Sequence, residues 1–379
     1  MTAPSARVAG NVARIELVHA PVSPKTTWSF VELTADDGSK GVGEASLLQH
    51  AAPLEAAFVA ARSALQGAPL ATVVEFAATR ARVTLADAAI ASALEQAGWD
   101  LRARRAGVPV WAELEGDGSR CVPLYANINR RTVDRSTSGF LRSATEAAAA
   151  GFRALKIAPF DDVTPVNVDT PAGRDRVRHG LARAAAAREA IGSNAELYVD
   201  CHWRFTPASA LVAIDALSEL RVTWFECPLQ EHVDAIPAIT RLRDHANARG
   251  MRLAGLEQLC SKRAFAPWLD AGAYDVVMPD VKYCGGIAEL IAIGREAARH
   301  GVACAPHNPS GPVSHAASLA ACSALGEPLL LEHQWDETPW FFTIGGKGLP
   351  RPVNGGSALP FASGLGVALN LEGLNVRRV

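Results

Sequence analysis

Apolar and polar positions near the N-terminus follow the two-residue alternation of β-strands. Strand-like runs occupy residues 12–19, 26–34 and 41–45. An Asp-Asp-Gly turn at 36–38 separates the second run from the third, and Asp-Gly between strand-like runs is a strong hairpin signal. The pattern therefore predicts antiparallel strands at the start of the chain.

Residues 51–107 change to an alanine-rich pattern with helical periodicity. From 85 to 106 apolar residues recur at the spacing of one helix face, and Gly107 follows as a helix stop. Residues 1–120 are thus predicted to form a small α+β domain in which the strands precede the helices.

Beyond residue 121, short apolar runs recur, and each is followed by a helix-like segment. Successive runs mostly lie about 25–45 residues apart, which suits a strand, a helix and two turns. The eight runs are 122–126, 154–157, 197–199, 222–225, 253–256, 274–278, 302–305 and 329–331. Eight such units predict a (β/α)-barrel over residues 121–350. An open doubly wound sheet would need a glycine-rich phosphate turn after an early strand, which this sequence lacks.

The glycine- and proline-rich stretch 354–379 predicts a loop-rich return strand and not a further barrel unit. Hydrophobic residues make up 49% and charged residues 20% of the 379 positions, so the chain can bury a sizeable core. The formal net charge is −2 and no Lys/Arg run is present. This composition argues against nucleic-acid and membrane-surface partners.

The first twenty residues lack the apolar core of a signal peptide, and no window of about 18 uncharged apolar residues occurs. We therefore expect a cytoplasmic protein. The seven cysteines are spread out and none forms a C-x-x-C pair, which argues against a disulfide framework and a zinc ribbon. We expect them to be small buried residues.

A polar, mostly ionisable residue follows seven successive runs, at the end where barrel enzymes build their active sites. These residues are Lys156, Asp200 with His202, Glu226, Glu257, Asp280, His307 and Glu332. One alone is better explained as a helix cap or a solvated loop residue. Seven at the same structural position indicate one shared site.

Asp200, Glu226 and Glu257 place carboxylates on three consecutive predicted strands. Converging carboxylates repel one another unless a cation offsets their charge. Ligands that are all oxygen favour a hard ion, so we expect a Mg²⁺ site.

Asp280 and His307 follow adjacent runs, and a carboxylate bonded to an imidazole fixes its tautomer and raises its basicity. We therefore expect His307 to act as a general base. His202 lies two residues beyond Asp200, and positions i and i+2 of a strand share a face. We expect His202 to point into the barrel mouth beside the metal.

Several segments resemble the enolase superfamily, in particular its mandelate racemase subgroup, over nearly the whole chain. The N-terminal "TTWSFVELTADDGSKGVGEAS" is similar to the capping-domain hairpin, and "GLGVALNLEGL" to the C-terminal return into that domain. "LYVDCHWRF", "WFECPL", "LAGLEQL", "VVMPDVKYCGG" and "CAPHNPSGP" resemble barrel strands three to seven. The resemblance implies a modified TIM barrel at 121–350 with an α+β capping domain at 1–120, completed by residues 351–379.

By this resemblance, the carboxylate trio corresponds to the three magnesium ligands and His307 with Asp280 to the dyad that acts on the α-proton. Glu332 corresponds to the group that hydrogen-bonds the enediolate. The subgroup carries Lys-x-Lys after strand two, whereas this chain has Lys156-Ile157-Ala158. Ala158 cannot move a proton, so two-base racemisation is doubtful, and Lys156 is expected to supply positive charge.

Asp200-Cys201-His202 and the following Arg204 are similar to galactonate-type acid-sugar dehydratases of this superfamily. There the strand-three histidine protonates the leaving 3-hydroxyl. The expected function is therefore that of a Mg²⁺-dependent hydro-lyase, which converts an aldonate or aldarate into a 2-keto-3-deoxy acid. We expect a small acid sugar as its partner and a homo-oligomer as its assembly.

Candidates for substrate contacts are weaker. By the resemblance, loops of the capping domain close over the substrate, where Lys25, Trp28 and His50 are candidates. After the first barrel run, the candidates for sugar hydroxyls are Asn127, Asn129 and Arg130, and Arg204 after the third run is a further candidate for a substrate contact.

Three alternatives stay open at this point. A racemase or epimerase would need a second base, from His202 or Lys282. A non-catalytic barrel would fail to bind Mg²⁺. A muconate-lactonising enzyme is disfavoured, because that subgroup uses lysines where this chain has Ala158 and a histidine dyad.

Overall fold

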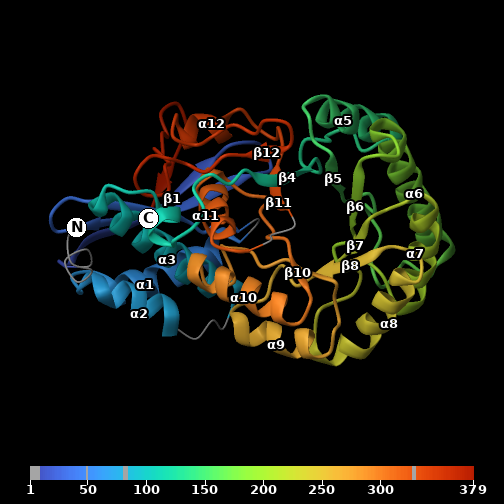
Figure 1. The fold of residues 1–379 in the computed structure, drawn as a ribbon, viewed down its shortest axis with the longest axis horizontal. Coiled ribbons are helices and arrows are strands. Elements are labelled where there is room, and N and C mark those ends of the chain that lie inside the picture. Colours follow the sequence, from blue (N-terminus) through green and yellow to red (C-terminus); the bar gives the residue numbers. More distant parts are fainter. Residues whose placement is uncertain (1–8, 48–49, 80–83, 327–329) are drawn as a thin grey trace.

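The computed structural model describes residues 9–47, 50–79, 84–326 and 330–379. A small sheet with its helices lies beside a larger ring of strands wrapped by helices (Figure 1). The first described strand and the C-terminus both lie on the side of the small sheet. The chain therefore leaves the small domain once, builds the ring and returns.

The small sheet is antiparallel and confirms the predicted strands. Its order is β13-β1-β2-β3, with β1 at Val12–Pro21, β2 at Thr27–Ala35 and β3 at Lys40–Glu44. The last of the four, β13 at Arg377–Arg378, pairs with β1. The C-terminal segment thus completes the capping domain, as the resemblance implied.

Helices α1 (Ala51–Leu65), α2 (Leu70–Thr79) and α3 (Leu85–Ala106) follow the strands, and α3 packs against β3. The side chain of Thr84 caps the first turn of α3, and Gly107 ends the helix in a left-handed conformation with φ of 69°. Glycine adopts that conformation without the steric cost of a β-carbon. The predicted helix over 85–106 is confirmed at both ends.

The ring is a parallel barrel, in which the described strands run in the order β10-β9-β8-β7-β6-β5-β4-β11. A backbone hydrogen bond of 3.3 Å from Glu332 N to Pro306 O joins the two ends of this order. The bounds are β4 Val122–Asn127, β5 Ala154–Ile157, β6 Glu196–Asp200, β7 Trp224–Glu226, β8 Arg252–Gly255, β9 Val276–Val277, β10 Ala303–Cys304 and β11 Leu331–Gln334. Each contains part of a predicted run, although Leu329 of the last run lies outside the described residues.

A helix follows each barrel strand, and together the helices form the outer layer (Figure 1). They are α5 Thr137–Ala149, α6 Pro171–Ile191, α7 Pro207–Glu219, α8 Ile236–Asn247, α9 Lys262–Asp270, α10 Ile287–Arg299, α11 Pro312–Ser323 and α12 Trp340–Gly345. The short α4 (Val110–Glu113) precedes the barrel, and β12 (Gly356–Ser357) pairs antiparallel with β4. This is the modified TIM barrel that was expected; the exact domain boundaries at 120 and 350 stay a proposal.

None of the helices in the described ranges is long and apolar enough to cross a membrane. All seven cysteines fall within the described residues and are free thiols, and five of them are buried. Cys121 is exposed and Cys260 is partly so, so the expectation of burial holds for most of them but not all.

The capping domain is fixed to the barrel by a buried carboxylate at the end of β3. Glu44 accepts hydrogen bonds from the backbone nitrogens of Gly311 (2.8 Å) and Ser314 (2.9 Å), at the start of α11. The free N–H groups at a helix start favour a negative charge. Together with the hydrogen bonds between Gln96 and Val281 and between Glu95 and Ile287, this contact joins the capping domain to segments that follow barrel strands.

We predict that Gly43→Ala destabilises the capping domain. A β-carbon at Gly43 would overlap the backbone carbonyl of Ala93 in α3, and overpacking of this kind costs about 1–3 kcal/mol. Gly326→Ala is the control, because a β-carbon there meets nothing within 4 Å. Thermal and urea unfolding should show a lower stability for Gly43→Ala alone; equal stability of the two variants would contradict the packing.

Candidate active site

The inside of the barrel has an apolar floor and a charged rim, and the strand period of two residues creates both. A buried cluster fills the floor and contains Tyr125, Ala154, Tyr198, Trp224, Ala254, Val276, Met278 and Ala305. Two residues after four of these stand Asn127, Lys156, Asp200 and Glu226. Alternate residues of a strand face the same side, so the rim residues lie one layer above the floor, at the strand ends.

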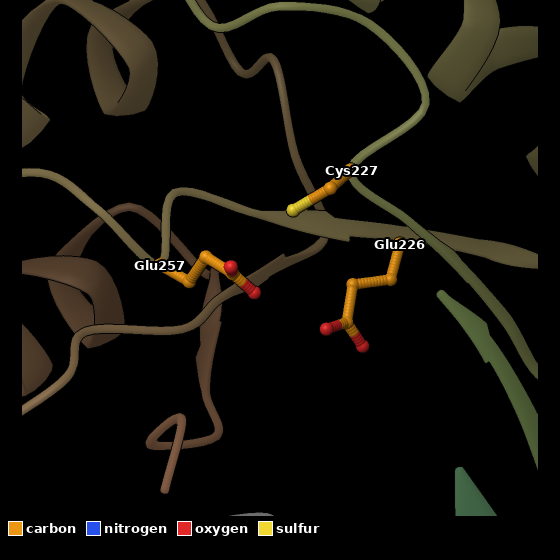
Figure 2. A group of neighbouring side chains, drawn as sticks. All are labelled: Glu226, Cys227 and Glu257. Atoms are coloured by element: carbon orange, nitrogen blue, oxygen red, sulfur yellow. The ribbon is translucent and has the colours of Figure 1, made fainter. Parts of the chain in front are cut away.

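Glu226 and Glu257 bring their carboxylates together at the ends of β7 and β8. One carboxylate oxygen of each and the Sγ of Cys227 lie within 4.8 Å of one another. Figure 2 shows the two carboxylates turned toward each other, with the Cys227 side chain beside them. Asp200 lies next to Glu226 in the strand ladder but outside this close group.

The electrostatics of Glu226 and Glu257 fit an additional positive charge, whereas at Asp200 His202 outweighs burial and already holds the pKa below its usual value. Burial and the nearby Asp200 charge together raise the pKa of Glu257 to about 8. Burial also raises the pKa of Glu226 well above its usual value. Glu257 Oε2 is buried and has no hydrogen-bond partner among the described residues. A divalent cation with oxygen ligands would answer both features.

Lys156 places a positive charge among the buried carboxylates of the rim. Its Nζ lies 2.7 Å from Glu226 Oε1 and 2.8 Å from Glu332 Oε1, and all three side chains are buried. Burial opposes the charged amine, yet the two carboxylates raise the pKa of Lys156 well above its usual value. The two carboxylates therefore favour the charged form of Lys156.

His307 and Asp280 form the predicted dyad. His307 Nδ1 lies 2.8 Å from Asp280 Oδ2, and its Nε2 lies 3.3 Å from Glu257 Oε2. The imidazole therefore stands between its carboxylate partner and the acidic cluster. Asp280 is also bound by the ammonium of Lys282, which is fully buried. Lys282 is thus tied to the dyad and does not project from it.

His202 lies beside the cluster, but the structural reason given for this was wrong. Strand β6 ends at Asp200, and His202 stands in a left-handed turn with φ of 46°, so the two residues do not share a strand face. The side chain folds back instead, so that His202 Nε2 lies 2.7 Å from Asp200 Oδ2. Burial lowers the pKa of His202, but the Asp200 carboxylate outweighs it and raises the pKa overall.

Left-handed residues other than glycine gather at three successive strand ends. After β6 they are His202 and Trp203 (φ 57°), after β7 Cys227 (φ 46°), and just before Glu257 stands Leu256 (φ 74°). Such conformations cost on the order of 1–3 kcal/mol each and concentrate at functional sites. The strained backbone residues therefore lie at the same end of the barrel as the ionisable side chains.

Three candidates for substrate binding already have structural partners. Asn127 Nδ2 donates to Glu332 Oε1 over 2.6 Å, and Asn129 Oδ1 accepts from the backbone nitrogen of Ala158. Arg204 donates to the backbone carbonyls of Phe160 and Val163, each over 3.1 Å. These contacts brace the rim, so a direct role toward substrate stays a proposal for all three.

The capping-domain candidates are scattered. Lys25 is exposed in the short β1–β2 turn, next to Thr26, which bonds Glu337 after β11. Trp28 is buried against Phe341 and lines a cavity of about 370 Å³ beside β11. His50 is exposed and precedes α1.

Arg130, on the loop after β4, lies 3.4 Å from Glu337. Within the described residues, these contacts place the tip of the β1–β2 turn and the loop after β4 on the same loop after β11.

Sequence reasoning missed several residues that hold the site together. Asn308 donates its backbone nitrogen to Glu332 Oε2 (3.0 Å), and Trp224 Nε1 donates to Glu226 Oε2 (3.1 Å). Glu231 also bonds the turns of the rim. Asn308 could have been recognised by its position directly after His307, and Trp224 by its place two residues before Glu226 on the same strand. Glu231 is brought to the rim only by the tertiary structure.

The family comparisons agree with this geometry. Residues 12–115 match the mandelate racemase / muconate lactonizing enzyme N-terminal domain, and residues 139–373 match the family described as enolase C-terminal domain-like. The chain belongs to the mandelate racemase / muconate lactonizing enzyme family of the enolase superfamily. The expected resemblance is confirmed over both domains.

Relatives in this family carry names from acid-sugar metabolism. The chain is 28% identical to a D-galactonate dehydratase of Verminephrobacter eiseniae, over 88% of this chain and 82% of that protein. It is 29% identical to a D-galactarolactone cycloisomerase of Agrobacterium fabrum, over 76% and 73%.

A solved structure described as mandelate racemase/muconate lactonizing enzyme from Jannaschia sp. CCS1 is 25% identical. It has a TM-score of 0.82 and covers 95% of each chain. The fold of this protein is therefore that of the family along nearly its whole length.

We predict that Lys156→Met destabilises the protein and that Lys262→Met does not. Removing one partner of a buried ion pair costs about 3–5 kcal/mol, because the remaining charges are left uncompensated. Lys262 pairs with Glu296 at 3.6 Å on the surface, where 45% of its side chain is exposed, and such pairs contribute about 0–1 kcal/mol. Melting temperatures measured in chelator should separate the variants; equal values would show that Lys156 does not balance the rim.

Proposed function

We propose that this protein is an acid-sugar dehydratase that depends on a divalent metal ion, with Mg²⁺ as the expected ion. It is a lyase, the class to which its dehydratase-named relatives belong. The proposed substrate is an aldonate or aldarate, and the proposed product is the 2-keto-3-deoxy acid.

The observation that carries the proposal is the placement of the two histidines. His307 contacts Glu257 and His202 contacts Asp200. An imidazole therefore lies beside each of two of the three carboxylates at the rim. Dehydration next to a carboxylate needs one group that removes the α-proton and one that protonates the leaving hydroxyl. The two histidines supply this pair.

Asp200, Glu226 and Glu257 are the residues that would hold the metal ion. When bound, the ion would supply positive charge to the substrate carboxylate and to the enediolate that forms from it. Cys227 lies in the same group but carries a sulfur ligand, which Mg²⁺ does not favour. We therefore assign the three carboxylates and not the thiol.

His307 is the proposed base. Its Nδ1 is engaged by Asp280, which leaves Nε2 facing the cluster to accept the α-proton. Asp280 then stabilises the imidazolium by its negative charge. Lys282 shares Asp280 and is fully buried, so it orders the carboxylate and does not meet the substrate.

His202 is the proposed acid for the leaving hydroxyl. The Asp200 carboxylate raises the pKa of His202, and 42% of its side chain is exposed, which leaves it open toward an incoming substrate. His202 transfers a proton to the departing oxygen as the carbon–oxygen bond breaks, and the resulting enol tautomerises to the ketone. Elimination of water balances the reaction without any oxidant.

The proposed role of Glu332 differs from the one that the resemblance implied. Burial alone would raise its pKa, but Lys156 holds the pKa of Glu332 below its usual value. Its two carboxylate oxygens already contact Lys156 Nζ, Asn127 Nδ2 and the backbone nitrogen of Asn308. We therefore propose that Glu332 positions the side chains of Lys156 and Asn127. Lys156 in turn stabilises the negative charge that develops on the enediolate.

Racemisation and epimerisation are the second candidate function. They require a base opposite His307. Ala158 cannot act as one, Lys156 is held protonated by two carboxylates, and Lys282 is buried against Asp280. His202 is the other candidate, and the Asp200 carboxylate raises its pKa and so favours the protonated form. This favours dehydration.

A cycloisomerase is present among the relatives, so substrate screens should include lactones beside aldonates and aldarates. The homo-oligomer stays a prediction.

We predict that replacing each histidine in turn separates exchange of the substrate α-proton from elimination of the hydroxyl. His307→Asn should lose both the exchange of the substrate α-proton with D₂O and dehydration, by about 10²–10⁴-fold. His202→Asn should lose dehydration but keep exchange, and asparagine tolerates the left-handed turn at this position. Mass spectrometry of recovered substrate and a colour assay for 2-keto acids measure the two steps.

The control is His245→Asn, which removes the imidazole of another His–Asp pair, 2.8 Å apart between α7 and α8. It should retain both steps. Dehydration by His202→Asn at the wild-type rate would remove His202 from the mechanism, and no turnover of any acid sugar by the wild-type protein would reject the dehydratase.

We predict that the stripped protein binds one Mg²⁺ at the rim and melts at a higher temperature when it does, since a ligand that binds only the folded state stabilises it. Glu257→Gln should weaken the binding by at least about tenfold, because it removes a charged ligand. Glu146→Gln is the control, since Glu146 is a surface partner of Arg131. Calorimetric titration measures the affinities; equal affinities in all three proteins would refute the assigned ligands.

A further inference from the structure

One carboxylate contacts all three left-handed turns of the rim. Glu231 Oε2 accepts a hydrogen bond from Trp203 Nε1 over 3.1 Å, in the turn after β6. Its Oε1 accepts from the backbone nitrogen of Leu256 over 2.7 Å, in the turn after β8. The thiol of Cys227, after β7, lies 3.9 Å from the same Oε1. The strained residues therefore share one acceptor.

The surroundings of Glu231 are shaped to bring it there. The hydroxyl of Tyr274 donates to Oε1 over 2.8 Å. Gly255 ends β8, and a β-carbon on it would overlap Glu231 Oε1 and the Tyr274 ring. Glycine at this position is what allows the carboxylate to approach the end of the strand. A partly buried carboxylate with donors on both oxygens is satisfied and rigid.

The contacts matter because of what stands next to each bonded residue. His202 precedes Trp203, and Glu257 follows Leu256. Left-handed residues other than glycine persist only where their surroundings over-determine them. The side chain of Glu231 provides that restraint, because it accepts hydrogen bonds from both Trp203 and Leu256. It thereby holds the neighbouring residues His202 and Glu257, the proposed acid and a proposed metal ligand, at fixed positions relative to one another.

We propose that Glu231 is a positioning residue that locks the turns presenting His202 and Glu257. It acts through Trp203 on the first turn and through the backbone of Leu256 on the second, and touches neither the substrate nor the metal ion. The proposal rests on the function proposed above for what His202 and Glu257 do. The claim that Glu231 holds the two turns is independent of that function.

Glu231→Gln tests the proposal with little change in shape. The amide has one acceptor and one donor end, so in either orientation a donor faces Trp203 Nε1 or the group at Leu256. Loss of a supporting contact of this kind typically costs 10–100-fold in activity or metal affinity. We expect kcat for dehydration to fall by about 10–100-fold with a smaller change in KM, and Mg²⁺ affinity to fall by about tenfold.

Trp203→Phe separates the two turns, because it removes only the indole N–H. We expect it to lower dehydration while leaving Mg²⁺ affinity and α-proton exchange near the wild-type values. Glu196→Gln is the matched control, since Glu196 also accepts from a tyrosine hydroxyl, that of Tyr198, but at the opposite end of the barrel. It should behave as the wild-type protein does.

Hydrogen–deuterium exchange of the Leu256 amide tests the positioning without any substrate. The amide should be protected in the wild-type protein and in Glu196→Gln and exposed in Glu231→Gln, with an unchanged circular dichroism spectrum. Unchanged protection together with unchanged kcat would overturn the proposal, as would equal loss of Mg²⁺ affinity in Trp203→Phe and Glu231→Gln. Failure of the dehydratase assignment alone would leave the exchange result in place.

Discussion

Repulsion among the carboxylates at the barrel rim is the constraint on which the site depends. Asp200, Glu226 and Glu257 stand at neighbouring strand ends, and burial makes each charge costly. Lys156 offsets part of that cost through its contacts with Glu226 and Glu332. The raised pKa values of Glu226 and Glu257 show that the compensation is incomplete. A site of this kind is prepared for a further cation.

The rest of the rim serves to hold these charges at fixed positions. Asp280 orients His307, Asp200 orients His202, and Glu44 fixes the capping domain to the start of α11. Left-handed turns aim the side chains from the strand ends, and their strain is balanced by buried hydrogen bonds. Stability and the proposed chemistry are thus coupled, because two of the carboxylates that repel one another are the ones that His202 and His307 contact.

The departure at Ala158 and the addition of His202 describe one change in chemistry. Alanine stands where the subgroup has its second lysine, and a histidine stands two residues after Asp200. The buried pairs of Lys156 and Lys282 agree with this, since each lysine is held by carboxylates and cannot replace the missing base. These contacts support the proposal of elimination over inversion.

The sequence alone determined the strands, the order of the barrel units and the identity of the rim residues. Periodicity and turn residues are local properties, so the Asp-Gly turn, the stop at Gly107 and the polar residue after each run could be recognised without coordinates. The dyad of Asp280 and His307 followed from the same rule, because neighbouring parallel strands end side by side.

Only the tertiary structure decided how the rim is braced. The turn that carries His202, the use of Asn129 and Arg204 as backbone ties, and the convergence of three turns on Glu231 depend on contacts between loops far apart in the chain. No periodic pattern encodes such contacts, because loop conformations are set by hydrogen bonds and packing that exist only once the barrel has closed.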